Sequence, residues 1–133
     1  MTMERKVLVV EDCRDLRELL YKGLALLGWD VVLARSGQEA LNKLRCDSPG
    51  VILLDMRMPH INGYELARIL KAHPVYRKIP ILAASGYSGR LSREQCLAVG
   101  CADFITKPFA FSELETRLTD LLPAGKPKTN DAL

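Results

Sequence analysis

Four short apolar runs in this chain each end on a polar side chain that can take part in chemistry. The polar residues at these ends are Glu11, Asp12, Asp55, Ser85 and Lys107. If the four runs are neighbouring parallel strands, three carboxylates, a hydroxyl and an ammonium group meet at one edge of a sheet. Open α/β sheets bind their ligands at that edge, outside the carboxyl ends of the strands. The residue types predict a site for a divalent metal and a phosphoryl group.

The rest of the chain alternates between strand-like and helix-like patterns. Apolar runs predict five strands at residues 7–10, 31–33, 51–54, 79–84 and 104–106. Between and after them, apolar residues recur every three or four positions, as on one face of a helix. The strands are continuous apolar runs, which is expected when helices cover both faces of a sheet. The pattern therefore predicts a doubly wound α/β fold with five parallel strands, five helices and right-handed crossovers.

Polar residues in front of the helical patterns predict where several helices begin. Four pairs have the spacing of a capping box or a similar helix start: Ser36 with Glu39, Asn62 with Glu65, Ser92 with Gln95, and Ser112 with Glu115. Glycines predict two helix ends, at Gly28 and Gly100. These signals place the connections between strands and helices, and the connections are short.

The size and charge of the chain exclude several function classes. Its 133 residues suit one domain, predicted over residues 1–123 with a flexible tail at 124–133, and leave no room for an attached output domain. The net charge of +3 has no dense basic run, so direct nucleic-acid binding is not expected. No apolar stretch has the ~20 residues of a membrane span, and no signal peptide is visible. We expect a cytoplasmic protein.

The four cysteines do not have the spacing of a structural zinc site. They are Cys13, Cys46, Cys96 and Cys101, with no pair of the Cys-x-x-Cys type. We expect them to be reduced, small buried residues, except that Cys13 follows the acidic pair and lies near the rim of the predicted site.

The acidic residues have the chemistry of a magnesium site. Magnesium prefers oxygen ligands, and two or three carboxylates from separate strand ends supply them. A bound cation relieves the repulsion among crowded carboxylates. Asp55 stands alone at the end of the central strand, where its carboxylate could attack an activated phosphoryl group. Lys107 and Ser85 are suited to holding phosphoryl oxygens.

Four motifs together resemble the response-regulator receiver domain of two-component signalling. They are Glu11-Asp12, Leu53-Leu54-Asp55-Met56-Arg57-Met58-Pro59, Ala84-Ser85-Gly86-Tyr87 and Thr106-Lys107-Pro108-Phe109. They occur in the family's order, and the resemblance covers about residues 6–122. It implies a flavodoxin-like sheet with strand order 2-1-3-4-5.

The resemblance implies a role for each matching residue. Asp55 corresponds to the phosphoacceptor, which takes phosphate from a histidine kinase or a histidine phosphotransfer protein. Asp12 corresponds to a ligand of Mg²⁺ beside Asp55, and Glu11 to one that acts through water. Mn²⁺ is a possible substitute. The backbone carbonyl of Arg57 corresponds to a further ligand.

The remaining matches concern the phosphoryl group and the switch. Ser85 and Lys107 correspond to the residues that bind the phosphoryl group, and the Lys107-Pro108 bond is expected to be cis. Phe104 occupies the aromatic switch position, where the family often has Tyr. Phosphorylation is expected to move Ser85 and Phe104 together and to remodel the face of the fourth helix, fifth strand and fifth helix for an effector protein.

The oligomeric state is expected to be a monomer or a weak, phosphorylation-dependent dimer. Charged residues on the same face could form ion pairs between subunits, as in the receivers of some transcription factors: Arg93, Asp103, Glu113 and Arg117. The alternative is a solvated charged face, because exposed ion pairs contribute only about 0–1 kcal/mol each.

Several other functions remain as alternatives. A degenerate receiver would bind partners without phosphorylation, and the chain could also be the receiver fragment of a hybrid histidine kinase. A phosphatase of the haloacid dehalogenase type needs a second acid where this chain has Arg57. A flavodoxin-like cofactor binder needs a phosphate loop where this chain has an acidic pair. We therefore expect no enzyme, only self-catalysed phosphotransfer to Asp55 and autodephosphorylation.

Overall fold

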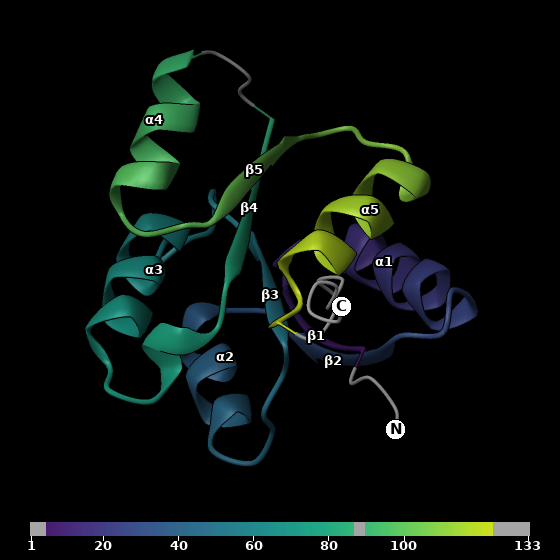
Figure 1. The fold of residues 1–133 in the computed structure, drawn as a ribbon, viewed down its shortest axis with the longest axis horizontal. Coiled ribbons are helices and arrows are strands. Elements are labelled where there is room, and N and C mark those ends of the chain that lie inside the picture. The colour runs from purple at the N-terminus through teal and green to yellow at the C-terminus, as the bar shows by residue number, and fades with distance from the viewer. Residues whose placement is uncertain (1–4, 87–89, 124–133) are drawn as a thin grey trace, which may run out of the picture.

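The computed structural model describes residues 5–86 and 90–123 (Figure 1). The elements follow one another as β1 (Lys6–Val10), α1 (Arg14–Leu26), β2 (Asp30–Ala34), α2 (Gly37–Leu44), β3 (Val51–Asp55), α3 (Gly63–Ala72), the 3₁₀ helix η1 (Tyr76–Lys78), β4 (Ile81–Ser85), α4 (Arg90–Ala98), β5 (Asp103–Thr106) and α5 (Phe111–Leu121). The alternation of strand and helix predicted from the apolar pattern is confirmed. The predicted tail, residues 124–133, lies outside the described residues.

All strand pairs in the sheet are parallel, and the strand order is β2-β1-β3-β4-β5. This is the order 2-1-3-4-5 that the resemblance implied. The strand that follows β1 in sequence, β2, lies on one side of β1, and all later strands lie on its other side. The connections that follow the neighbouring strands β1 and β3 therefore lead in opposite directions. A ligand site is therefore expected at the carboxyl ends of β1 and β3.

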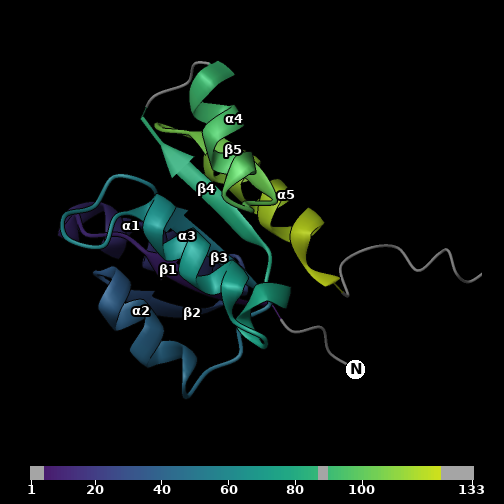
Figure 2. The same ribbon diagram turned by 90° about the vertical axis from the view of Figure 1, so that its left-hand side faces the viewer.

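Helices cover both faces of the sheet, as Figures 1 and 2 show. On one face, α1 and α5 pack through residues such as Leu20, Leu24 and Leu114. On the other face, α2, α3 and α4 pack through residues such as Leu44 and Leu66. Every residue of β3 and β4 is buried, which explains why their sequences are uninterrupted apolar runs up to the final residue.

Two of the four predicted helix starts are confirmed. The Ser36 hydroxyl accepts a hydrogen bond from the Glu39 N–H at 3.1 Å and begins α2. Asn62 and Glu65 form a complete capping box at the start of α3. Gly28, with φ +92°, follows the end of α1, in a left-handed conformation that favours glycine.

The other two predicted starts are wrong. The α4 helix begins at Arg90, so Ser92 lies inside its first turn rather than in front of it. The α5 helix begins at Phe111, after Ala110, which makes no side-chain cap. Tertiary packing overrides the local signal at α5, because the Phe111 ring fills the space beside Gly23 of α1. Gly100, with φ +103°, ends α4 as predicted.

The cysteine prediction is partly wrong. All four thiols are free, but only Cys96 and Cys101 are buried, whereas Cys13 and Cys46 are exposed. Cys46 is exposed because it follows the last turn of α2, in the connection to β3. Within residues 5–86 and 90–123, no helix is long and apolar enough to cross a membrane.

Candidate functional site

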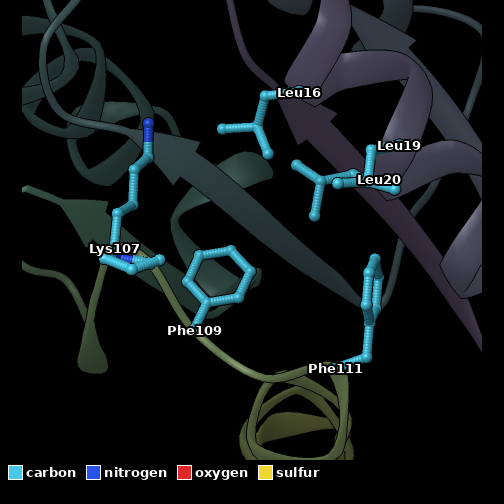
Figure 3. A pocket seen from close by; sticks show the side chains of 7 residues that line it. Leu16, Leu19, Leu20, Lys107, Phe109 and Phe111 are labelled. Atoms are coloured by element: carbon cyan, nitrogen blue, oxygen red, sulfur yellow. The ribbon is translucent and has the colours of Figure 1, made fainter.

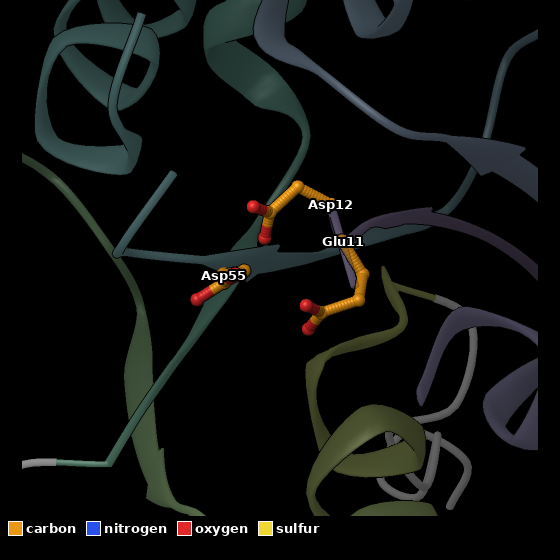
Figure 4. A group of neighbouring side chains, drawn as sticks. All are labelled: Glu11, Asp12 and Asp55. Atoms are coloured by element: carbon orange, nitrogen blue, oxygen red, sulfur yellow. The ribbon is translucent and has the colours of Figure 1, made fainter. Parts of the chain in front are cut away.

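Three carboxylates meet at the carboxyl ends of β1 and β3, and Figure 4 shows them gathered there. Glu11 and Asp12 follow β1 directly, and Asp55 is the last residue of β3. The two strands pair in register, with Val10 opposite Leu54, so the acids that follow them become neighbours. One oxygen from each of the three carboxylates lies within 4.8 Å of the others.

Lys107 reaches the same point from the loop after β5. Its Nζ lies 3.0 Å from Glu11 Oε1 and 3.3 Å from Asp55 Oδ1. The ammonium group therefore bridges two of the three acids. The Lys107-Pro108 peptide bond is cis, as the resemblance implied.

Backbone N–H groups hold the two buried acids in place. Asp55 Oδ1 accepts a hydrogen bond from the Arg57 N–H at 3.1 Å, and Glu11 Oε2 accepts one from the Cys13 N–H at 3.1 Å. Glu11 and Asp55 are only 3% and 4% exposed, whereas Asp12 is exposed to solvent. Two of the acids are thus embedded in the fold, and the third faces the opening of the site.

The surroundings of Asp55 disfavour its ionised form. The pKa of Asp55 is raised from 3.8 to about 7, mainly by burial, with smaller upward contributions from the charge of Glu11 and a hydrogen bond with Asp12. The Arg57 N–H and Lys107 act in the opposite direction. Burial also lowers the pKa of Lys107, but the attraction of Asp55 and Glu11 outweighs this effect, and the net shift is upward. Negative charge is in excess at this site.

The three acids fit a small divalent cation. Two oxygens on opposite sides of Mg²⁺ lie about 4.2 Å apart, because each Mg–O bond is about 2.1 Å. The oxygens here span up to 4.8 Å, so a slight closure or one bridging water makes up the difference. A divalent cation would also relieve the repulsion that raises the pKa of Asp55. The donor set is made of oxygen alone, which favours Mg²⁺ or Mn²⁺ over softer metals.

Ser85 and Phe104 lie on the two strands beyond β3. Ser85 ends β4 and is 2% exposed, and its backbone carbonyl accepts a hydrogen bond from the Lys107 N–H at 2.8 Å. Phe104, in β5, packs in the core on the α2, α3 and α4 face. The structure therefore brings Ser85 to the edge where Asp55 lies, whereas the Phe104 ring lies within the core.

Three of the residues considered for ion pairs between subunits are paired within this chain. Arg117 lies 3.0 Å from Asp103 Oδ2 and 3.6 Å from Glu113 Oε2. It also donates to the carbonyl oxygen of Phe104 at 3.0 Å. These contacts tie α5 to β5, and a dimer through this face stays a prediction.

Sequence reasoning missed an apolar cavity that begins beside the acids. Figure 3 shows it between α1 and the loop from β5 to α5. The volume of the cavity is about 380 Å³. Its lining consists of Leu16, Leu19, Leu20, Lys107, Pro108, Phe109 and Phe111. Leu19 of α1 is 55% exposed although it is a large apolar residue. The signal was present, since Leu19 widens the apolar stripe of α1 beyond the face that the sheet can cover.

A second missed residue is Arg17 in α1. Its Nη1 donates to the backbone carbonyls of both Glu11 and Asp12. Hydrogen bonds from a side chain to backbone carbonyls cannot be recognised from sequence. The position of Arg17, one turn into the helix that follows the acidic pair, was the only indication that the sequence offered.

The family profile of the response regulator receiver domain matches residues 7–119. The chain belongs to the response regulator receiver family. The response regulator MprA of Mycobacterium bovis is 36% identical over 126 residues, which are 95% of this chain and 54% of that protein. The probable transcriptional regulator ycf27 of Porphyridium aerugineum is 33% identical over 119 residues, 90% of this chain and 48% of that protein. This receiver domain thus spans about half the length of these curated relatives.

Solved receiver structures have the same fold. The chemotaxis protein CheY4 of Vibrio cholerae superposes with a TM-score of 0.85 at 29% identity, covering 90% of this chain and all of that one. The receiver domain of the sensor histidine kinase PA1611 from Pseudomonas aeruginosa superposes with a TM-score of 0.81 at 30% identity, over 90% and 98% of the two chains. That protein was crystallised with a magnesium ion in its active site cleft. Receivers similar to this chain thus include one from a histidine kinase.

Proposed function

We propose that this receiver domain is a magnesium-dependent phosphorylation switch in which Asp55 accepts the phosphoryl group. The observation that supports this most directly is the meeting of Asp55 with two other acids and Lys107 at one strand edge. Asp55 is the acid at the centre of the sheet, and its Oδ1 is held by the Arg57 N–H and by Lys107.

The bound cation supplies charge that stabilises the ionised carboxylate and the phosphoryl oxygens. Asp12 and Asp55 would hold it directly, Glu11 through water, and the Arg57 backbone carbonyl would be a further ligand. Mn²⁺ could replace Mg²⁺. Asp55 must be ionised to act as a nucleophile, and burial raises its pKa to about 7, so the cation site and the nucleophile depend on one another.

The transfer forms one bond and breaks one. An ionised oxygen of Asp55 attacks the phosphorus of a phosphohistidine, the P–N bond breaks, and the imidazole of the donor leaves with the electron pair. Lys107 then pairs with a phosphoryl oxygen in place of the Asp55 carboxylate, and the Ser85 hydroxyl donates to another. In autodephosphorylation, water attacks the phosphorus, the P–O bond to Asp55 breaks, and inorganic phosphate leaves while the carboxylate is restored.

The switch would run from Ser85 to the face formed by α4, β5 and α5. When Ser85 turns toward the phosphoryl group, space opens beside β4, and the Phe104 ring on the neighbouring strand can move into it. Phe104 lacks the hydroxyl of tyrosine, so its movement gains no hydrogen bond at the surface. The bias between two such states is typically a few kcal/mol. An effector protein would bind the remodelled face. The receiver would be a monomer or a weak dimer that forms on phosphorylation.

The experiment that tests the phosphoacceptor compares wild type with Asp55→Asn. Each protein is incubated with Mg²⁺ and acetyl phosphate, and covalent phosphate is measured by intact-protein mass spectrometry. We expect the mass of one phosphoryl group on the wild type, its loss when EDTA replaces Mg²⁺, and no label on Asp55→Asn, because an amide is not a nucleophile here. Equal labelling of both proteins would contradict the proposal. An unlabelled wild type would favour a degenerate receiver.

The phosphodonor would be a histidine kinase or a histidine phosphotransfer protein, docked partly in the apolar cavity beside Lys107. A donor must bring its imidazole to Asp55, and the cavity extends from Lys107 along α1. We expect Leu19→Glu to slow transfer from a phosphohistidine protein about tenfold or more, because a charge would have to be desolvated in the interface. Labelling by acetyl phosphate should not change.

The control for this prediction is Tyr21→Glu, which places the same charge on an exposed position of α1 outside the cavity. Transfer rates are measured with a phosphohistidine protein that labels the wild type. If Leu19→Glu and Tyr21→Glu behave alike, the cavity is not the docking surface. If Leu19→Glu also slows labelling by acetyl phosphate, its effect lies in the site and not in docking.

A further inference from the structure

One arginine of α1 binds the backbone of both acidic residues that follow β1. Arg17 Nη1 donates to the carbonyl oxygen of Glu11 at 3.0 Å and to that of Asp12 at 3.2 Å. We propose that Arg17 is a positioning residue for the cation site, which holds these two carbonyls and thereby sets the direction of the Asp12 carboxylate. This inference rests on the proposed function, in which Asp12 is a direct ligand.

The loop that carries the acids needs such a support. It consists of the three residues between β1 and α1, and its last residue, Cys13, precedes the helix without a side-chain cap. A serine or aspartate at that position would normally order the helix start by binding a backbone N–H. Here the Cys13 N–H instead donates to Glu11 Oε2, and Arg17 closes the loop from the carbonyl side.

The effect of Arg17 falls mainly on Asp12. The Glu11 side chain is held separately, by Lys107 on one oxygen and by the Cys13 N–H on the other. Asp12 is exposed, so apart from its contact with Asp55 the direction of its side chain depends on its own backbone conformation. Because Arg17 binds the Asp12 carbonyl, it restricts that backbone and reduces the conformational entropy lost when a cation binds.

Electrostatic repulsion and positioning predict opposite changes in cation affinity when Arg17 is removed, so an experiment can distinguish them. The guanidinium group of Arg17 is a positive charge close to the site, and by Coulomb repulsion alone its removal would strengthen the binding of a cation. If Arg17 acts by ordering the loop, its removal weakens cation binding instead. Supporting residues behind metal ligands typically contribute about 10–100-fold to metal affinity.

The test is a titration of the protein with Mn²⁺, in which free Mn²⁺ is measured by electron paramagnetic resonance without any phosphodonor. We expect Arg17→Met to raise the Kd for Mn²⁺ about tenfold, since methionine keeps much of the apolar stem and removes the donors. Arg14→Met is the matched control, because Arg14 lies on the same helix and, within the described part of the chain, pairs with Glu18 alone, at the surface. Its Kd should stay within about twofold of wild type.

An unchanged or lowered Kd in Arg17→Met would overturn the proposal. Arg17→Lys provides a second variant that keeps the charge and can still donate to a carbonyl, so it should recover part of the affinity. A Kd for Arg17→Lys as weak as that of Arg17→Met would also contradict the proposal, because the side-chain donor would then have no effect. Urea midpoints of each variant show that the titrated protein is folded.

The result also separates this inference from the proposed function. A wild-type chain that binds no Mn²⁺ would contradict the cation site itself. If wild type and Arg17→Met bind Mn²⁺ equally tightly, the cation site remains supported and only the role of Arg17 is contradicted.

Discussion

Replacing Gly63 by alanine is expected to lower the free energy of unfolding by about 3 kcal/mol, a shift in Tm of roughly 10 °C. Gly63 is the first residue of α3, and it packs against the end of β3. A Cβ atom here would lie 2.5 Å from Met56 Cα and 2.7 Å from the Asp55 carbonyl oxygen. Both neighbours are backbone atoms at the carboxyl end of β3, the central strand, so they cannot move aside cheaply.

The matched control for this substitution is Gly86→Ala. Among the described residues, a Cβ at Gly86 would meet no heavy atom within 4 Å, and we expect the stability of Gly86→Ala to stay within about 0.5 kcal/mol of wild type. Urea unfolding followed by circular dichroism gives both values. Equal stability of the two variants would show that α3 can shift away from β3. Because Asp55 carries the crowded carbonyl, Gly63→Ala should also weaken phosphorylation by acetyl phosphate.

Asp55→Asn is expected to stabilise the protein at pH 8 in the absence of divalent cations, and the gain should fade toward pH 4. Burial raises the pKa of Asp55 from 3.8 to about 7, so the folded state prefers the neutral carboxyl group. The stability this provides is complete below pH 3.8 and is lost as the pH rises through 7. Above pH 7 the wild type carries the cost of an ionised, buried carboxylate, and asparagine does not.

The size of this effect follows from the same shift. A change from 3.8 to about 7 corresponds to roughly 4 kcal/mol at most. This upper bound already includes the attraction of Lys107. Taking about half of it, we expect a gain of about 2 kcal/mol, or roughly 6 °C in Tm at pH 8. Thermal unfolding in EDTA at pH 4, 6 and 8 measures it. Asp120→Asn, an exposed acid of α5, should change Tm by no more than 2 °C or so at each pH.

Magnesium should remove this difference between the two proteins. A ligand that binds only the folded state stabilises it in proportion to its concentration above Kd. We expect added Mg²⁺ to raise the Tm of the wild type at pH 8 and to change that of Asp55→Asn much less. A gain in Asp55→Asn that does not depend on pH would contradict the link to ionisation of Asp55.

The sequence alone was sufficient for the fold class, the strand order through its family resemblance, and the meeting of Asp55 with the acidic pair. Uninterrupted apolar runs indicate strands covered on both faces, and parallel strands necessarily bring their carboxyl ends to one edge. Helix starts at Ser36 and Asn62 were also readable, because a capping box is made by residues three positions apart. These features depend on short-range sequence patterns, or on the common direction of the strands in every parallel sheet.

Only the tertiary structure determined which charged groups at that edge contact one another and which of them are buried. It placed Lys107 between Glu11 and Asp55, buried those two acids while leaving Asp12 exposed, and brought Arg17 back onto the loop. It also moved the start of α5 to Phe111, against the local capping signal. Burial and charge sharing are set by contacts between residues far apart in the chain, and such contacts leave no periodic trace in the sequence.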